Sequence, residues 1–518
     1  MSLPDEPVNE SSDQAIRTIV VLGGGSAGFL AALALKKHLS WANVVVVRST
    51  KMGVIGVGEG TIVSVVNFLH GFLEIDPTEF MQRSRASLKL GIRYLWGKRN
   101  QFFYTFDQEF TAPVPGSDIP RGYHCDDDCE FVGPVSALMA NDKACIRHSN
   151  GRPALGNSYA YHLENETFVH YLEELADRAG IQKIDDVVAS TSLGENGIEA
   201  LHLESGAKVE GDLYLDCSGF RSELLGKALE EPFDDFSDSL FCDGAIVGGW
   251  ERTDEDIYHP YTTAETMDHG WAWQIEHDHL VNRGYVYSSS FSDSDQAQAE
   301  FLQKNPKLKD VREVKFRTGV HRRTWVKNVV ALGNAAGFVE PLEATAIGVI
   351  CDATVNLVRA LRSSDGEIDG VQRKVYNQGQ RENWDLIKDF LALHYRFNDR
   401  LDTPFWRACQ SDISLGEAQI YADYYQKVGP DFSFLRSILK RDFFGAEGYL
   451  AMLHGQQVPY VRNVQLSARE RHAWKLYSNK TRETAMFGMN MQDCLSALRG
   501  NVGVASPKQY GSGELAWH

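Results

Sequence analysis

The sequence predicts a mixed α/β fold that contains a Rossmann-like nucleotide-binding module. Three observations support this prediction: an apolar run at residues 19–22, a glycine-rich turn directly after it at residues 23–28, and a second apolar run at residues 44–47. The 518 residues are 43% hydrophobic and 24% charged. This is ordinary globular composition in a chain long enough for more than one structural unit.

The first predicted elements are a strand, a helix and a second strand. Residues 19–22 (IVVL) are all apolar, as expected for a strand that is buried on both faces. The segment FLAALALKKHL after the glycines has helix-forming composition and apolar spacing. ANVVVVRST, centred on residues 44–47, predicts the second strand. Together they predict a βαβ unit with a right-handed crossover.

The turn GGGSAG fits the pattern G-x-G-x-x-G, with Gly23, Gly25 and Gly28 in the glycine positions. The first glycine allows the tight turn, the second lets the backbone approach a pyrophosphate, and the third allows close packing of helix on strand. The helix that follows offers free N–H groups and a partial positive charge. We interpret the turn as a dinucleotide site rather than as a purely structural glycine turn.

Two features bear on which dinucleotide is bound. The second strand is followed by Arg48, where an acid that holds a ribose hydroxyl is usual. Arginine suits a 2′-phosphate and favours NADP, but a surface arginine without a ligand role is equally consistent with the sequence. A second glycine cluster, VIGVGEGT at residues 54–61, carries Glu59 and has room for a bulky ring system, which favours a flavin.

Later segments are expected to extend this sheet and to build a second region. DLYLDCSG (212–219) and VKNVVALGNAAG (326–337) resemble strands, so the sheet is predicted to collect strands from distant parts of the chain. GWAWQIE (270–276) and GYVYSSSF (284–291) predict an antiparallel region. From Gly348 onward, apolar residues recur at helical spacing.

We therefore expect three parts. They are a polar tail (1–18), a nucleotide-binding module (19–360) with inserted substrate-side segments at about 90–180 and 235–310, and a mainly helical substrate-side part (361–518).

Composition excludes several classes of protein. A formal charge of −18 argues against a nucleic-acid partner. The polar start carries no signal peptide, and the apolar stretch that ends at Leu35 is too glycine-rich for a membrane span. Eight dispersed cysteines do not form a disulfide framework, and Cys125 and Cys129 lack a second ligand pair at zinc spacing. We expect a cytoplasmic, reduced protein without a bound metal or a membrane partner.

Several motifs in order along residues 18–500 resemble the flavin-dependent halogenases of the tryptophan halogenase family. These motifs are GGGSAG, IGVGEGT at Ile55, SLKLGIRY around Lys89, DCSGFRS at Asp216, GWAWQIE at Gly270, FVEPLEATAI at Phe338 and DTPFW at Asp402. The W-x-W-x-I signature at Trp271, Trp273 and Ile275 is the most specific, because it separates this family from ordinary flavin monooxygenases.

The resemblance implies an FAD-binding module of the flavin monooxygenase type and a two-component reaction. A separate flavin reductase supplies FADH2, O2 is the cosubstrate, and chloride or bromide is oxidised to a hypohalous acid. This oxidant travels through an internal tunnel to an electron-rich aromatic ring. A homodimer is common in the family.

The resemblance also assigns roles to individual residues. Lys89 matches the essential lysine, which polarises the hypohalous acid as an ammonium or is halogenated as a neutral amine; without the resemblance it would be read as a solvated helix-face lysine. Glu343 matches the catalytic glutamate that accepts the ring proton, with Glu340 as the rival. The amides of Thr345 and Ala346 match the halide site, although many members have glycine at the second position.

The remaining residues belong to the cofactor and to the wall between cofactor and substrate. Trp271 and Trp273 are expected to block the substrate from the flavin, with a purely structural core role as the alternative. Glu276 stands where the usual pattern has proline. The expected FAD contacts are Gly23, Gly25, Ser26, Ala27, Gly28, Ser49, Met52, Glu59, Gly60, Asn334 and Ile347.

The substrate side departs most from the family pattern. Tryptophan halogenases carry a Tyr-Tyr-Glu lid and a late tryptophan, whereas this chain has neither and carries Phe443, Phe444 and Gly445 near the expected tryptophan. Tyr104 and Phe106 retain the stacking faces. We expect a site for an indole or phenol without a fixed α-amino acid group. The alternatives are a single-component NADPH-dependent aromatic hydroxylase and a non-catalytic flavin-binding relative.

Overall fold

The computed structural model describes residues 15–53, 58–125, 129–438 and 444–500, and the predicted mixed α/β class with a Rossmann-like sheet is confirmed. Of the predicted polar tail, residues 1–14 lie outside the described residues, and Thr18 is already the first residue of a strand. Within the described chain, no helix is both long and apolar enough to cross a membrane.

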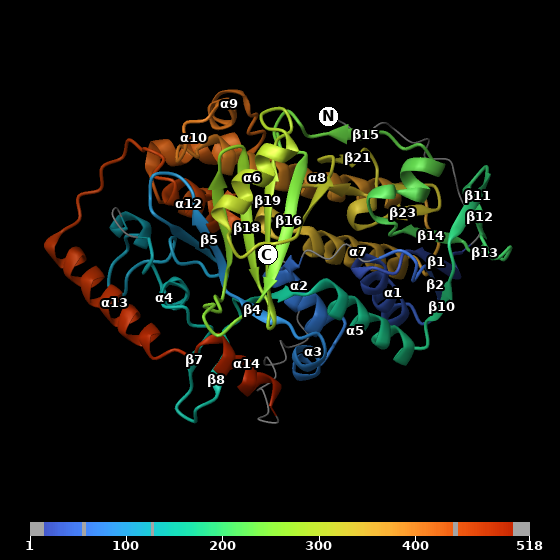
Figure 1. Cartoon of the computed structure of the whole chain (residues 1–518), viewed down its shortest axis with the longest axis horizontal. Coiled ribbons are helices and arrows are strands. Elements are labelled where there is room, and N and C mark those ends of the chain that lie inside the picture. Colours follow the sequence, from blue (N-terminus) through green and yellow to red (C-terminus); the bar gives the residue numbers. More distant parts are fainter. Residues whose placement is uncertain (1–14, 54–57, 126–128, 439–443, 501–518) are drawn as a thin grey trace.

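The Rossmann-like sheet collects strands from four distant parts of the chain, as predicted (Figure 1). β1 pairs in parallel with β2 and β14, and β14 pairs in parallel with β23. In spatial order its strands are β10 (Gln182–Asp185), β2 (Asn43–Arg48), β1 (Thr18–Leu22), β14 (Leu213–Asp216), β23 (Val329–Ala331) and β22 (Trp325–Val326).

The predicted helix after the glycine turn is α1 (Ser26–His38), whose residues from Gly28 to Leu35 are all buried. It is buried all round because α5 (Asn165–Arg178) and α7 (Ala346–Ser363) pack against it in addition to the sheet. The βαβ unit is therefore confirmed.

The predicted strand at residues 326–337 is wrong in one respect, because it is interrupted. β22 and β23 form a tight hairpin in which Lys327 has a φ of 52°. The Asn328 side chain fixes this turn by accepting from the Ile198 N–H at 2.9 Å and donating to the Ile198 carbonyl oxygen at 2.8 Å. A single helical turn, η5 (Gly333–Ala335), and a short strand, β24 (Gly337–Phe338), follow.

The second large sheet contains the predicted antiparallel pair, since β18 pairs antiparallel with β19. Along β18 the side chains alternate, so Trp271, Trp273 and Ile275 share the face that packs in the hydrophobic core between this sheet and the C-terminal helices. In spatial order the strands are β20 (Val311–Lys315), β16 (Gly244–Glu251), β19 (Leu280–Tyr287), β18 (Gly270–Glu276), β17 (Thr262–Met267), β5 (Gly91–Leu95) and β6 (Phe102–Thr105).

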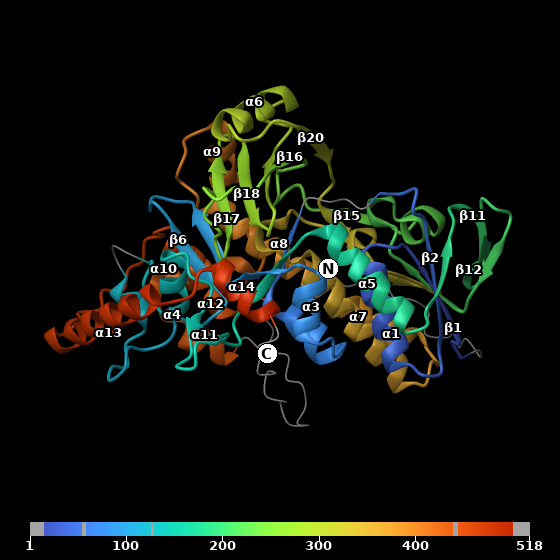
Figure 2. The ribbon, with the colours of Figure 1, turned by 60° about the horizontal axis from the view of Figure 1, so that its bottom comes forward.

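The C-terminal part is helical, as predicted, and one long helix links the two sheets (Figure 2). The helix α8 spans about 40 Å. In the first half of α8, Asn377 accepts from the N–H groups of Thr324 and Trp325 beside β22. The last turns of α8 pack in the hydrophobic core that also contains Trp271 and Trp273. The helices are α8 (Gly370–Arg396), α9 (Pro404–Asp412), α10 (Ala418–Val428), α11 (Ser433–Ile438), α12 (Gly445–Gly455), α13 (Ala468–Met486) and α14 (Met491–Arg499).

Smaller elements connect these layers. The small sheet β3-β9-β4 carries Lys89, which is the last residue of β4. The remaining strands are β3 (Glu59–Gly60), β4 (Ser87–Lys89), β7 (Ile146–Arg147), β8 (Pro153–Ala154), β9 (Ala160–Leu163), β11 (Val188–Gly194), β12 (Gly197–Leu203), β13 (Lys208–Glu210), β15 (Phe233–Asp235) and β21 (Gly319–His321). The remaining helices and turns are α2 (Val63–Asn67), η1 (Phe68–Phe72), α3 (Pro77–Arg83), η2 (Arg121–His124), α4 (Pro134–Ala140), η3 (Gly219–Arg221), η4 (Glu223–Ala228), α6 (Ser294–Lys304) and η6 (Pro341–Glu343).

Candidate active site

The glycine turn between β1 and α1 has the geometry of a phosphate-binding loop. Gly23 has a φ of 131°, and a Cβ there would lie 2.2 Å from the carbonyl oxygen of Cys217. A Cβ at Gly28 would lie 1.9 Å from the Gly23 carbonyl oxygen, whereas one at Gly25 would meet no atom within 4 Å. α1 begins at Ser26 without a side-chain cap. The loop leaves free N–H donors beside open space, which fits a pyrophosphate.

Arg48, the last residue of β2, forms an ion pair with a glutamate of α5. Its Nη2 lies 2.5 Å from Oε1 of Glu173 on α5, with about a fifth of each side chain exposed. Its Cβ would lie 2.7 Å from a Cβ at Gly24. Arg48 is therefore held by an ion pair beside the glycine turn, which is compatible with an arginine that has no ligand role.

The other predicted cofactor residues near β2 and β3 differ in their surroundings. The hydroxyl of Ser49 accepts from the N–H of Lys51 at 3.3 Å, and Met52 is exposed. Burial raises the pKa of Glu59 to about 7. A Cβ at Gly60 would lie 3.2 Å from Nζ of Lys89, so this segment contacts the predicted catalytic lysine. The other half of the predicted loop, residues 54–57, lies outside the described residues.

A small cavity lies where η5, β24 and the start of α7 meet. It brings together three predicted residues, Asn334, Thr345 and Ala346, while Ile347 is buried in the adjoining core. Thr345 precedes the first residue of the 18-residue helix α7 and makes no capping bond through its side chain, so the first N–H groups are available to an anion. The cavity is lined by Gly333, Asn334, Gly337, Phe338, Val339, Thr345, Ala346, Val349 and Trp384.

Lys89, the last residue of β4, is fully buried. Its Nζ donates to the carbonyl oxygen of Thr61 at 3.1 Å and lies 5.4 Å from the centre of the Phe106 ring. Within the described chain it makes no ion pair. Burial lowers the pKa of Lys89 to about 7, although the charge of Glu343 raises it. Near neutral pH the side chain is therefore present both as an ammonium and as a neutral amine.

Glu343, the last residue of η6, is 2% exposed and is held by two aromatic side chains. Tyr94 donates its Oη hydrogen to Oε1 of Glu343 at 2.5 Å, and Nε2 of His394 lies 2.7 Å from the same oxygen. The other carboxyl oxygen, Oε2, makes no hydrogen bond to any residue that the structure describes. Glu343 therefore has one anchored oxygen and one free oxygen.

Glu340, the rival three residues earlier, has different neighbours. It is fully buried; the indole N–H of Trp271 donates to its Oε2 at 2.6 Å, and the hydroxyl of Tyr395 donates to the same oxygen. Its Oε1 is buried and has no hydrogen-bond partner in the part of the chain that the structure describes. Burial raises the pKa of Glu340 to about 7. Glu340 is thus hydrogen-bonded to Trp271, one of the two tryptophans of the predicted wall.

Sequence reasoning did not identify Tyr94 or His394. Both come from elements far from Glu343 in sequence, β5 and α8, and only the fold brings them together. One signal was available: His394 lies in LALHYRF, where a titratable ring interrupts a run of apolar residues in a predicted helix.

The predicted wall residues Trp271, Trp273 and Ile275 are all buried, and the two indole rings lie 6.0 Å apart between centroids. Glu276, which replaces the usual proline, points to the opposite face of β18 and forms a buried ion pair with Arg252. This pairing explains how the chain accommodates a charged residue at that position.

The two predicted substrate residues contribute to different parts of the site. The Phe106 ring lies beside Lys89. The hydroxyl of Tyr104 donates to the Phe444 carbonyl oxygen at 3.2 Å. The Phe444 ring stacks on the Phe390 ring, with 3.9 Å between the two centroids. Phe390 lies on α8, one helical turn before His394. Phe443, predicted beside Phe444, lies outside the described residues.

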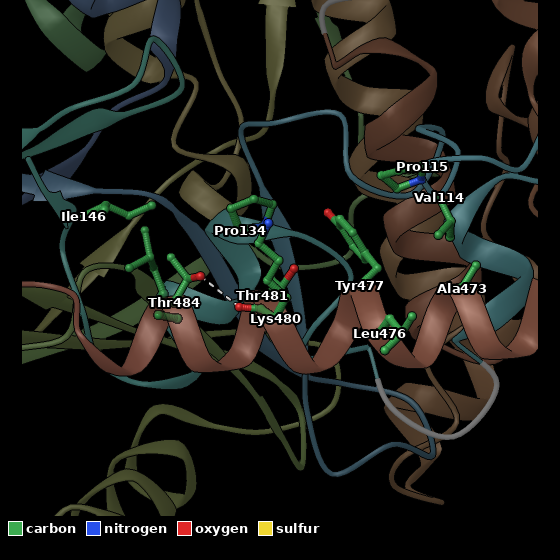
Figure 3. A pocket seen from close by; sticks show the side chains of 12 residues that line it. Val114, Pro115, Pro134, Ile146, Ala473, Leu476, Tyr477, Lys480, Thr481 and Thr484 are labelled. Carbon is green, nitrogen blue, oxygen red and sulfur yellow. Dashed lines mark hydrogen bonds between the residues drawn. The ribbon is translucent and has the colours of Figure 1, made fainter.

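A separate apolar cavity of about 530 Å³ lies between α13 and α4, and no predicted site residue lines it (Figure 3). Figure 3 shows Tyr477 and Leu476 of α13 facing Val114, Pro115 and Pro134. In the described residues, no group of three or more His, Cys, Asp or Glu side chains is arranged to hold a metal ion.

Comparisons with known proteins agree with this arrangement. The family model described as tryptophan halogenase matches residues 18–471. Tryptophan 6-halogenase ThaL of Streptomyces albogriseolus is 33% identical, with 76% of this chain and 79% of ThaL covered. Tryptophan 7-halogenase RebH of Lentzea aerocolonigenes is 32% identical, with 76% and 78% covered.

Among solved structures, that of MibH, a lathipeptide tryptophan 5-halogenase, superposes with a TM-score of 0.86 at 35% identity and covers 96% of this chain and 95% of MibH. The chain therefore belongs to the tryptophan halogenase family of flavin-dependent halogenases. It is an enzyme that needs reduced flavin from a separate reductase and acts on an aromatic substrate.

Proposed function

We propose that this enzyme uses reduced FAD, O2 and bromide or chloride to halogenate an electron-rich aromatic ring such as indole. A hypohalous acid passes through the interior to Lys89, and Glu343 assists loss of the ring proton. The observation that carries this proposal is the pair of buried, electrostatically coupled side chains, Lys89 and Glu343. Buried titratable groups with a specific charged partner are typical of functional sites.

The glycine turn and the cavity at the start of α7 supply what the cofactor and the halide require. The N–H groups at the start of α1 would hold the pyrophosphate, and those of Thr345 and Ala346 would hold the halide. When bound, reduced flavin supplies the two-electron activation of O2 that oxidises the halide. The fold has to keep that oxidant away from solvent and from other side chains.

Lys89 is suited to receive the oxidant. Among the described residues its Nζ makes a single hydrogen bond, to the Thr61 carbonyl oxygen, so the other N–H directions can donate to a hypohalous acid. Its low pKa also leaves a fraction of neutral amine that could be halogenated. The Phe106 ring beside it and the adjacent Gly60 exclude water from this amine.

The substrate is proposed to be held by aromatic faces rather than by a polar clamp. Tyr104, Phe390, Phe444 and Tyr449 form a connected aromatic cluster beside His394 and Glu343. Such faces suit a planar, electron-rich ring, and they offer no fixed partner for an α-amino or α-carboxylate group.

A second candidate is a tryptophan side chain within a peptide. The similarity to MibH favours it, since MibH is a lathipeptide tryptophan 5-halogenase whose structure is similar over 96% of this chain. In a peptide the α-amino and α-carboxyl groups are amides without charge, so a site that lacks a clamp for those charges suits such a substrate equally well.

One assay tests the function and separates the two candidates. Enzyme, reductase, FAD, NADH, O2 and either halide are incubated with indole, phenol, free tryptophan and N-acetyl-tryptophanamide, and the products are analysed by mass for halogen isotopes. We expect product from indole and little from free tryptophan. Preference for the blocked tryptophan would favour the peptide candidate, and strong preference for free tryptophan would contradict both.

The matched control is Lys89→Met, which keeps the length and volume of the side chain. We expect product to vanish while FAD binding, followed by flavin fluorescence, is unchanged. Product formation by this variant would remove Lys89 from its role. Light scattering of the unaltered enzyme measures its molar mass and so tests the expected homodimer.

A further inference from the structure

His394 is a fully buried histidine that the proposed function does not yet use. It lies on α8, contacts Glu343, Tyr94 and Trp96, and has no access to bulk water. We infer that the base which removes the ring proton is the hydrogen-bonded pair Glu343–His394, in which a protonated His394 keeps Glu343 ionised. The inference rests on the proposed function and names a positioning residue for that reaction.

Proton accounting supports a shared proton in this pair. Nδ1 of His394 lies 2.7 Å from the Phe390 carbonyl oxygen, which can only accept, so Nδ1 carries a hydrogen. Nε2 lies 2.7 Å from Oε1 of Glu343. Two acceptors do not approach this closely without a hydrogen between them. That hydrogen is therefore either on the carboxyl group or on a doubly protonated imidazole.

Tyr94 decides between these two states. Burial, followed by the charge of Glu343, raises the pKa of Tyr94 well above its usual value, so its phenol keeps its proton and donates to Oε1. A hydrogen bond donated by Tyr94 to Oε1 stabilises the carboxylate over the carboxylic acid, so the hydrogen between Oε1 and Nε2 lies on His394. The pair is therefore carboxylate and imidazolium, with Oε2 free to receive a proton.

The charged partner matters because an isolated carboxylate is unstable in such a buried place. The other titratable groups coupled to the pair are Lys89 from β4 and Tyr94 from β5. Of these only Lys89 is cationic, and its charge is partly lost near neutral pH. His394 supplies a second positive charge that does not depend on the amine that handles the oxidant.

The step itself is a simple proton transfer. Once the halogen has added to the ring, the C–H bond at the same carbon breaks, and its electron pair restores the aromatic system. The proton forms an O–H bond at Oε2 of Glu343, while His394 keeps its proton and stabilises the transfer through Oε1. No oxidant or reductant takes part in this step.

The first test reads the protonation state directly and does not need turnover. Enzyme carrying ¹⁵N-histidine is measured by NMR at pH 8, with His394→Gln used to assign the signal. We expect the His394 ring to show two protonated nitrogens, and Glu343→Gln to convert it to a neutral ring. A neutral His394 ring in the unaltered protein would overturn the inference, whether or not the halogenation assay succeeds.

The second test uses kinetics with the substrate found in the halogenation assay. His394→Gln keeps a hydrogen-bond donor to Glu343 but removes the positive charge, so Glu343 should be protonated at a higher pH. In a plot of kcat against pH, the fall of kcat on the acidic side (the acidic limb) should therefore move up by about one to three pH units. Loss of the ring proton should also become slow, giving a primary isotope effect with ring-deuterated substrate. The matched variant Tyr94→Phe removes a neutral donor and should move the limb less. A uniform loss of kcat without either change would show a merely structural role.

Discussion

Glu340 and Glu343 are three residues apart, both buried, and yet they lie in different environments. Glu343 contacts a histidine and a tyrosine and keeps one oxygen free, whereas Glu340 contacts two neutral donors, Trp271 and Tyr395. Burial raises the pKa of Glu340 to about 7. We propose that the hydrogen-bond partners, rather than burial alone, decide which of the two carboxyl groups acts as the base.

The strongest way to break this comparison is to neutralise each carboxyl group in turn. Glu343→Gln should lower product formation by about 10²–10⁴-fold, because a general base contributes on that scale. Glu340→Gln should lower it by less than about tenfold, because its hydrogen bonds to neutral donors survive in part. The measurement is the rate of formation of halogenated product at saturating halide. An equal loss of this rate in the two variants would contradict the comparison.

Lys89 sharpens the comparison because it is coupled to Glu343 and not to Glu340. Its pKa is about 7 in the folded state against 10.5 when exposed, so between these values the unfolded chain binds one more proton than the folded chain. Stability therefore rises with pH across this window. Lys89→Met should stabilise the fold by up to about 5 kcal/mol at pH 6.5, since one pKa unit corresponds to about 1.4 kcal/mol.

The stabilisation by Lys89→Met should shrink as the pH approaches 10. Denaturant unfolding of both proteins at pH 6.5 and 9.5 measures this change. A gain that is independent of pH would point to packing rather than to the buried charge.

The sequence predicted local features well, because each is carried by adjacent residues. The glycine turn, α1 and the alternation along β18 follow from short patterns whose physical causes are local. The site was predicted only through motifs, so Lys89, Glu343 and Glu340 could be named but not given partners. Their roles in catalysis stay predictions.

The partners could not be predicted, because they come from segments that only the tertiary fold brings together. His394 is 51 positions from Glu343 and Tyr94 is 249 positions away. The same reason explains Arg48, whose environment is set by Glu173 on a helix 125 residues further along, and Glu276, whose charge is balanced by Arg252 from another strand region.

A smaller effect concerns Glu340 alone. Its pKa is about 7 in the folded state against 4.5 when exposed, so between these values the folded chain binds more protons than the unfolded chain. Its contribution to stability is fully present below pH 4.5 and is lost as the pH rises through 7. Glu340→Gln should therefore stabilise the protein at pH 8 by about 1–3 kcal/mol relative to its effect at pH 5. Thermal unfolding of both proteins at the two pH values tests this, and an unchanged difference would mean that Glu340 is ionised in both states.

The smallest expected effect concerns the hydrogen bond from Trp271 to Glu340. Trp271→Phe keeps an aromatic ring in the wall but removes the N–H that donates to Oε2 of Glu340. Because Tyr395 still donates to the same oxygen, losing this hydrogen bond should cost only about 0.5–1.5 kcal/mol of stability. Trp273→Phe is the matched control, because Nε1 of Trp273 is buried and has no hydrogen-bond partner among the described residues, so its loss removes no such bond. If Trp271→Phe destabilises the protein no more than Trp273→Phe, the bond contributes nothing, and Glu340 is held by Tyr395 alone.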